Sequence, residues 1–167
     1  MVISKKPLIV KNLFFKDNRG DFLKLVHKEY FLNLNKKKII KQVNISNTKT
    51  KGTIRGFHYQ KKPYQEKKII TCIKGSIFDV VINMNKNSKY FGRIYKFILD
   101  VHKKTLIIPE GYAHGFQTLK NDCTILYMHT NYYKVDHEVT IYPLLKKISW
   151  PVKKKILSKK DLKGLKL

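Results

Sequence analysis

Short apolar runs recur along most of the chain. They are rich in Ile, Val, Phe, Tyr and Thr and are separated by Gly, Asn, Asp and Pro, which is typical of β-strands between turns. Helical periodicity is weak, and only a short turn near 27–35 and the lysine-rich tail after Trp150 favour helix. We expect strands at 22–31, 38–46, 68–75, 76–85, 90–100, 104–111 and 123–133.

The strand-like stretch GTIRGFHYQ carries polar groups on both of its faces. A period of two puts Arg55, Phe57 and Tyr59 on one face and His58 and Gln60 on the other. A simple core strand does not tolerate polar side chains on both faces, so this stretch is a candidate wall of a binding site.

The length and the apolar content bound the fold. At 167 residues the chain has the size of one domain, and we expect a single domain over 1–167. Its 43% apolar and 12% aromatic residues argue against disorder despite a net charge of +25. Many short strands in this length predict an all-β sandwich or barrel, most simply a double-sheet jelly roll with short helical segments at the periphery and C-terminus.

The sequence shows neither a membrane span nor a secretion signal. No run approaches the roughly 18 apolar residues of a membrane helix, and the N-terminus lacks a long apolar core and a small-residue cleavage site. We therefore expect a cytoplasmic protein without a membrane partner. Cys72 and Cys123 lack metal-binding spacing and are expected to be buried free thiols.

Lysine supplies nearly all of the positive charge. Arginine occurs at positions 19, 55 and 93 alone, and the lysines are scattered instead of gathered on one arm or helix. A nucleic-acid binder usually has a focused basic patch and a recognisable reading element. We therefore expect a solvated lysine surface and no nucleic-acid partner, although this surface attracts anionic small molecules.

Two histidines stand out by their context. His58 lies in GTIRGFHYQ, and His114 follows a Pro-x-Gly turn in IIPEGYAHGF. These stretches resemble the two short motifs of the cupin superfamily, whose metal-binding members carry a second histidine where this chain has Gln60. An amide is a poor metal ligand, so no metal site is expected. Taken alone, His58 is either a general base or a core histidine bonded to a backbone carbonyl.

Motifs spread over residues 14–161 resemble the dTDP-4-dehydrorhamnose 3,5-epimerase family. This family consists of cupin-type jelly-roll enzymes of nucleotide-sugar metabolism. The matching stretches, in order, are FFKDNRGDFLKLV, KQVNISNTKTKGTIRGFHYQ, QEKKIITCIKGSIFDVVI, SKYFGRIYKFIL, LIIPEGYAHGFQTL, ILYMHTNYY, ISWP and LSKKD.

The resemblance implies inversion of carbons 3 and 5 of a 4-keto-6-deoxy sugar attached to dTDP. Both carbons adjoin the ketone, so loss of either proton gives an enolate, and the chemistry requires neither a cofactor nor a metal. It needs a base, a proton donor on the opposite face and positive charge near the enolate oxygen. The matching motifs make His58 the base, Asp161 its partner, Tyr127 the donor and Lys68 the cation, with adjacent Lys67 as a one-residue alternative.

The resemblance also implies the residues that bind the substrate. Arginine suits a pyrophosphate because its planar fork matches phosphate oxygens. The family's strand carrying Arg19 reaches the neighbouring subunit's site, which implies a homodimer with exchanged N-terminal strands. Asp79 is expected either to contact substrate or to pair with Lys68 or a histidine. The implied substrate-binding residues are Arg19, Phe22, Gln42, Asn44, Arg55, Gln60, Asp79, His114 and Tyr133.

Some positions depart from the family pattern and keep other functions open. Asp21 and Lys24 replace an aromatic residue and a glutamate that lie near the nucleoside in the family. A single-carbon epimerase, or one acting on another nucleotide sugar, therefore stays an alternative. Two alternatives from other classes are a catalytically silent sugar-binding cupin and a basic β-barrel that binds nucleic acid.

Overall fold

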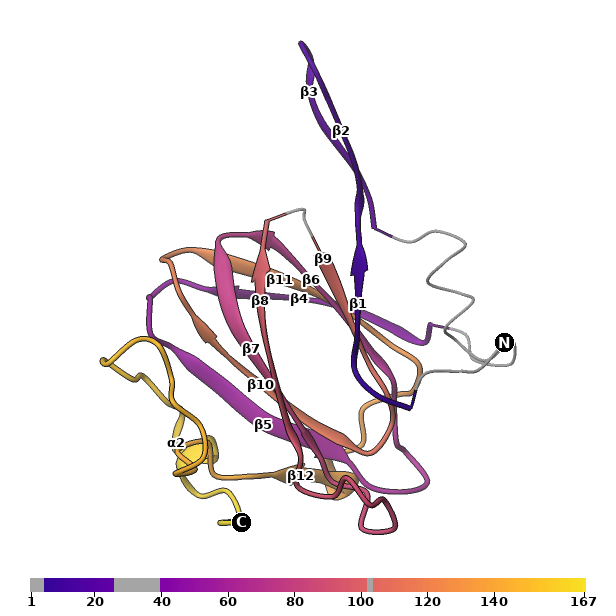
Figure 1. Ribbon diagram of the computed structural model, residues 1–167, viewed down its shortest axis with the longest axis vertical. Coiled ribbons are helices and arrows are strands. Elements are labelled where there is room, and N and C mark those ends of the chain that lie inside the picture. The colour runs from indigo at the N-terminus through magenta and orange to yellow at the C-terminus, as the bar shows by residue number, and fades with distance from the viewer. Residues whose placement is uncertain (1–4, 26–39, 102–103) are drawn as a thin grey trace.

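Two five-stranded antiparallel sheets face each other in the computed structural model, which describes residues 5–25, 40–101 and 104–167 (Figure 1). The first sheet has the strand order β1 (Leu8–Lys11), β9 (Lys104–Ile108), β6 (Lys68–Lys74), β11 (Cys123–His129) and β4 (Gln42–Thr48). The second has the order β12 (Glu138–Thr140), β5 (Ile54–Gln60), β10 (Tyr112–Thr118), β7 (Ser76–Asn83) and β8 (Ile94–Asp100). The predicted all-β, jelly-roll fold is confirmed.

The main core lies between the two sheets. Alternate residues of the strands point inward and exclude water, which is the principal stabilisation of such a sandwich. Strand β10 is buried along its whole length, and β7 nearly so. The buried core residues are Ile70, Cys72, Ile77, Val81, Leu99, Leu106, Ile108, Tyr112, Phe116, Cys123 and Ile125.

The C-terminal segment covers the outer face of the second sheet. Trp150 stacks on Phe57 of β5 with ring centroids 5.9 Å apart and meets the Phe78 ring edge-on at 5.9 Å. Its indole N–H donates to the carbonyl of Pro143 at 3.0 Å. This packing leads the chain to α2 (Lys159–Leu162), a one-turn helix beside β5 (Figure 1).

Strand β5 contains an irregularity that changes which residues share a face. His58 pairs with His114 and Arg55 with Phe116, so β5 uses one more residue than β10 over the same interval. The extra residue is a bulge next to Gly56, whose φ of +112° suits glycine.

This bulge corrects the predicted alternation in GTIRGFHYQ. Phe57 packs against the C-terminal segment as part of the outer cluster, and Ile54 belongs to that cluster too. Arg55 lines the same cavity as His58 and Gln60, although uniform alternation assigned it to the opposite face. The shift by one residue puts Arg55 on the same face of β5 as His58.

A hairpin of β2 (Leu13–Asp17) and β3 (Gly20–Lys24) forms a separate two-stranded sheet that projects from the sandwich (Figure 1). Its apolar side chains are unusually accessible, with Phe15 56% and Phe22 62% exposed. Exposed aromatic groups of this kind mark a surface that another molecule covers.

Most expected strands are present with shifted boundaries. The runs at 68–75, 76–85, 104–111 and 123–133 contain β6, β7, β9 and β11. The run 38–46 overlaps β4, which extends to Thr48, and 90–100 becomes strand only from Ile94. The run 22–31 overlaps β3, but its end and the helical turn near 27–35 lie outside the described residues. Short helices occur at η1 (Val135–His137) and α2. None of the helices in the described part of the chain has the length and apolar character of a membrane span.

Candidate active site

A cavity of about 840 Å³ lies between the sheets and is closed on one side by the C-terminal segment. Such a volume suits a ligand of nucleotide-sugar size. Most residues expected from the sequence line it, although they come from distant parts of the chain. These residues are Gln42, Asn44, Arg55, His58, Gln60, Lys68, His114, Tyr127, Tyr133 and Asp161.

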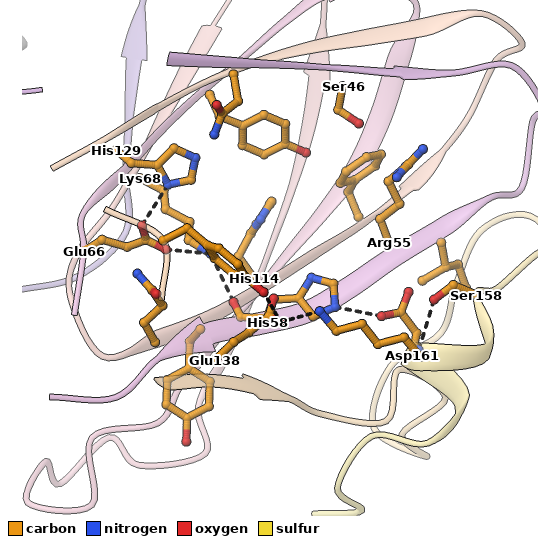
Figure 2. Close-up of a pocket in the computed structure, with 18 of the residues that line it drawn as sticks. Ser46, Arg55, His58, Glu66, Lys68, His114, His129, Glu138, Ser158 and Asp161 are labelled. Atoms are coloured by element: carbon orange, nitrogen blue, oxygen red, sulfur yellow. Dashed lines mark hydrogen bonds and ion pairs between the residues drawn. The ribbon is translucent and has the colours of Figure 1, made fainter. Parts of the chain in front are cut away.

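His58 and Asp161 form a close contact at the wall of this cavity (Figure 2). Nε2 of His58 lies 2.7 Å from Oδ1 of Asp161, and the side chains are 30% and 4% exposed. The side chain of Ser158 caps α2 by accepting a hydrogen bond from the Asp161 backbone N–H at 3.0 Å. The cap fixes the first turn of the helix and with it the carboxylate that meets the imidazole.

The charge state of Asp161 determines which nitrogen of the His58 imidazole carries the proton. Burial alone raises the pKa of Asp161, but the hydrogen bond and charge of His58 and hydrogen bonds from Ser158 and Gly56 outweigh it. The net pKa lies below the ordinary value, so Asp161 is ionised at neutral pH and only accepts hydrogen bonds. Nε2 of neutral His58 therefore carries the proton, and Nδ1 is the nitrogen with a lone pair.

Tyr127 approaches the same cavity from the opposite sheet. Burial raises the pKa of the Tyr127 hydroxyl, and the nearby charge of Asp79 raises it further, so the group keeps its proton at neutral pH. The Tyr127 ring meets His114 edge-on with centroids 6.2 Å apart. A lone-pair nitrogen on one sheet and a protonated phenol on the other are what opposite-face proton transfer needs.

Lys68 lines the cavity, whereas the adjacent Lys67, the alternative cation, does not. The Lys68 ammonium donates to the carbonyl oxygen of His58 at 3.2 Å, and its side chain is 10% exposed. An ammonium that lines the cavity can stabilise negative charge that develops on a bound ligand.

Asp79 does not line the cavity. Its side chain is 0% exposed and accepts from Nε2 of His114 at 2.8 Å. Asp79 thus pairs with a histidine, which is one of the two alternatives that the sequence left open. Asp79 orients the His114 ring from behind, as carboxylates do for other functional imidazoles.

The side chains of Gln60 and Gln42, both predicted to bind substrate, form hydrogen bonds with backbone groups. The Gln60 amide donates to the carbonyls of Tyr64 and Tyr132, both at 3.0 Å, and accepts from the Lys134 N–H at 2.6 Å. Through these hydrogen bonds Gln60 holds the loop that follows β11. Gln42 accepts from the Tyr133 N–H at 2.6 Å and so holds that aromatic residue at the cavity.

Arg55 lies at the rim, while Arg19 and Phe22 lie away from the cavity. Nε of Arg55 donates to the Thr48 hydroxyl at 3.1 Å. Arg19 and Phe22 belong to the projecting hairpin, where the Arg19 guanidinium pairs with Asp17 at 2.6 Å and is 85% exposed. Neither hairpin residue lines the cavity of its own chain.

Comparison with known proteins identifies the family. A sequence model described as dTDP-4-dehydrorhamnose 3,5-epimerase matches residues 5–167. The chain belongs to this family. A dTDP-4-dehydrorhamnose 3,5-epimerase from Shigella flexneri is 35% identical over 162 residues, covering 95% of this chain and 90% of the relative.

Solved structures of epimerases share the fold closely. The dTDP-4-dehydrorhamnose 3,5-epimerase of Bacillus anthracis, with TDP and PPi bound, has a TM-score of 0.90 and 34% identity, covering 96% of this chain and 94% of that one. A dTDP-6-deoxy-D-glucose-3,5-epimerase of Legionella pneumophila, in complex with dTDP-4-keto-L-rhamnose, has a TM-score of 0.88 and 30% identity, covering 96% and 87%.

This epimerase-family site contains residues that the motifs did not single out. His129 follows from strand periodicity, since it lies two positions after Tyr127 on β11, whereas Glu66 lies just before β6 and has no such signal. Others have no local signal, because the cavity gathers them from the last part of the chain; these are Glu138, Ser158 and Lys160. Among the described residues, no group of three or more His, Cys, Asp or Glu is arranged to hold a metal ion.

The lowered pKa of Asp161 predicts a specific pH dependence of stability. A carboxylate whose folded-state pKa lies below its ordinary value of 3.8 stabilises the fold above that value, and this contribution disappears as the pH falls through the folded-state pKa. Asp161→Asn should therefore lower the free energy of unfolding at about pH 5, and the difference from wild type should shrink below pH 3.8.

Urea unfolding of both proteins across this pH range measures the difference. The matched control is Asp136→Asn, which alters an exposed aspartate outside the cavity. A wild-type-to-Asp161→Asn difference that stays constant or grows on acidification contradicts the assigned electrostatics.

Proposed function

We propose that this protein inverts carbons 3 and 5 of dTDP-4-keto-6-deoxy-D-glucose to give dTDP-4-keto-L-rhamnose. The observation that carries the proposal is the placement of His58 and Tyr127 on opposite sheets around one cavity, with Asp161 behind the base. Inversion requires removal of a proton from one face of the carbon and delivery to the other, which a single residue does not supply.

Each inversion then consists of two proton transfers. Nδ1 of His58 takes the proton from the carbon beside the ketone, and the electrons of the C–H bond move to form an enolate. The Lys68 ammonium stabilises the negative charge on the enolate oxygen. The Tyr127 hydroxyl donates its proton to the opposite face of the carbon, and solvent afterwards restores both side chains.

Asp161 prepares the base for this step. It holds the imidazole in the tautomer with a free Nδ1 and stabilises the imidazolium that forms when His58 accepts a proton. His114, oriented by Asp79, lies edge-on to Tyr127 in the cavity and is assigned to holding the ketone region of the sugar. Arg55 and Tyr133, which also line the cavity, are assigned to the diphosphate and the nucleoside.

Solvent isotope incorporation tests the assignment. In heavy water with dTDP-4-keto-6-deoxyglucose, NMR should show deuterium entering at carbons 3 and 5, and the inverted product should accumulate. His58→Asn should abolish both, because general base catalysis contributes about 10²–10⁴-fold. The absence of deuterium from both carbons would contradict the assigned reaction. Incorporation at one carbon alone would support a single-carbon epimerase instead.

The site is completed, in this proposal, by a second copy of the chain. Arg19 and Phe22 were expected at the substrate but lie on a hairpin away from their own cavity, with its aromatic groups exposed. Insertion of this hairpin into a partner's site covers the aromatic residues and brings an arginine to the diphosphate. We propose a homodimer with exchanged N-terminal strands, acting in the cytoplasm, where the buried free cysteines stay reduced.

Mixed dimers test this exchange. Arg19→Ala and His58→Asn are each expected to be strongly impaired alone, because each alters every site of its own homodimer. When the two variants are co-expressed with different tags, each heterodimer contains one site with neither substitution, and random assembly should restore about a quarter of wild-type activity.

Pairing His58→Asn with Tyr127→Phe provides the control. Both residues line the cavity of one chain, so every site in that heterodimer keeps one substitution and activity should stay low. Equal activity in the two mixtures would rule out exchange of Arg19 between subunits.

A further inference from the structure

A buried cluster of charged residues adjoins the proposed acid and cation. Oε2 of Glu66 lies 3.0 Å from Nδ1 of His129, and Oε1 lies 3.5 Å from Nζ of Lys68 (Figure 2). The side chains of Glu66, Lys68 and His129 are 8%, 10% and 13% exposed. One carboxylate thus contacts two cavity-lining groups, one with each oxygen.

Glu66 is ionised in this setting. Burial alone raises the pKa of Glu66, but the hydrogen bond from His129 and the charge of Lys68 outweigh it, so the net pKa is lowered. A buried carboxylate is costly unless it is paired. Its position next to the lysine that meets the enolate therefore calls for an explanation, because a negative charge there weakens the cation's effect on a nearby anion.

The geometry of Lys68 supplies this explanation. An ammonium has three N–H donors. The His58 carbonyl takes one at 3.2 Å, and Glu66 attracts the ammonium from a second direction at 3.5 Å. The flexible side chain is held at two points, and its third donor is left for a ligand in the cavity. The Glu66 carboxylate lies closer to His129, at 3.0 Å, than to Lys68, at 3.5 Å, so it interacts more strongly with His129.

His129 in turn contacts the proposed proton donor. Its ring stacks on Tyr127 with centroids 6.0 Å apart and an interplanar angle of 18°. The two residues are neighbours on the inner face of β11, and His114 meets Tyr127 edge-on at 6.2 Å. Since Glu66 holds Nδ1 of His129, the imidazole plane that supports the phenol is fixed.

We propose that Glu66 and His129 are positioning residues for the epimerisation: Glu66 aims the Lys68 ammonium at the enolate oxygen, and His129, anchored by Glu66, holds Tyr127 for proton delivery. This inference rests on the proposed function. The Glu66 carboxylate then sets the position of Lys68, which stabilises the enolate, relative to Tyr127, which protonates it.

The two roles predict different kinetic defects. Glu66→Gln keeps a side-chain oxygen that accepts from Nδ1–H of His129 but loses the charge that attracts Lys68. Deuterium exchange and inversion should therefore fall together by about tenfold to a hundredfold, with little change in KM. His129→Ala loosens Tyr127, so inversion should fall more than exchange, because His58 returns a solvent deuteron to the face from which it took the proton. His129→Phe keeps an aromatic ring against Tyr127 but loses the bond to Glu66, so its ratio of exchange to inversion should lie between those of His129→Ala and wild type.

Thr71→Val is the matched control. Thr71 is a buried polar residue on the same strand as Lys68 and bonds Thr105 at 2.6 Å, but it does not line the cavity. Its exchange-to-inversion ratio should equal that of wild type. An unchanged ratio in His129→Ala, or a Glu66→Gln variant as fast as wild type, overturns the proposal.

Crystal structures of Glu66→Gln and His129→Ala test the same inference without relying on activity. The Lys68 ammonium in the first and the Tyr127 hydroxyl in the second should shift by about 1 Å or more, on the scale that impairs proton transfer. If wild type neither exchanges nor inverts the sugar, the proposed function fails by itself. If both side chains keep their wild-type positions, the positioning roles are wrong whatever the activity.

Discussion

The contact between His58 and Asp161 depends on how the chain end covers the second sheet. The two residues are far apart in sequence, and the 2.7 Å contact exists because the C-terminal segment packs on the outer face of β5. Trp150 stacks on Phe57 there, and the Ile54 N–H donates to the Ile156 carbonyl at 2.8 Å. The packing that buries this apolar face therefore also brings the Asp161 carboxylate to the His58 imidazole.

The bulge in β5 and the two-sheet architecture complete the arrangement. The extra residue at Gly56 lets Phe57 face the C-terminal segment while Arg55 and His58 both face the cavity. The first sheet contributes Tyr127 from the other side, so the proposed base and the proposed acid both line the cavity. In the proposed mechanism, proton removal and return on opposite faces follow from the two-sheet architecture.

The sequence predicted the strands better than it predicted the contacts. Long alternating apolar runs identified β6, β7 and β11, whereas β1 and β12 are too short, at four and three residues, to show a period. Alternation placed Arg55 on the wrong face because it assumes a strand without bulges. The partnership of Asp161 with His58 has no local signal, and only the resemblance of LSKKD to a family motif indicated it. His129 was within reach of periodicity, because it lies two positions after Tyr127 on β11, whereas Glu66 lies outside the strands.

The central claim is that His58 presents Nδ1 to the substrate because Asp161 holds Nε2–H. Nitrogen-15 NMR of the histidine rings, with His58 assigned by comparison with His58→Asn, measures this directly. The neutral ring should carry its proton on Nε2, and the preference should weaken in Asp161→Asn. A proton on Nδ1 of His58, or a tautomer that Asp161→Asn leaves unchanged, would contradict the assignment of the base.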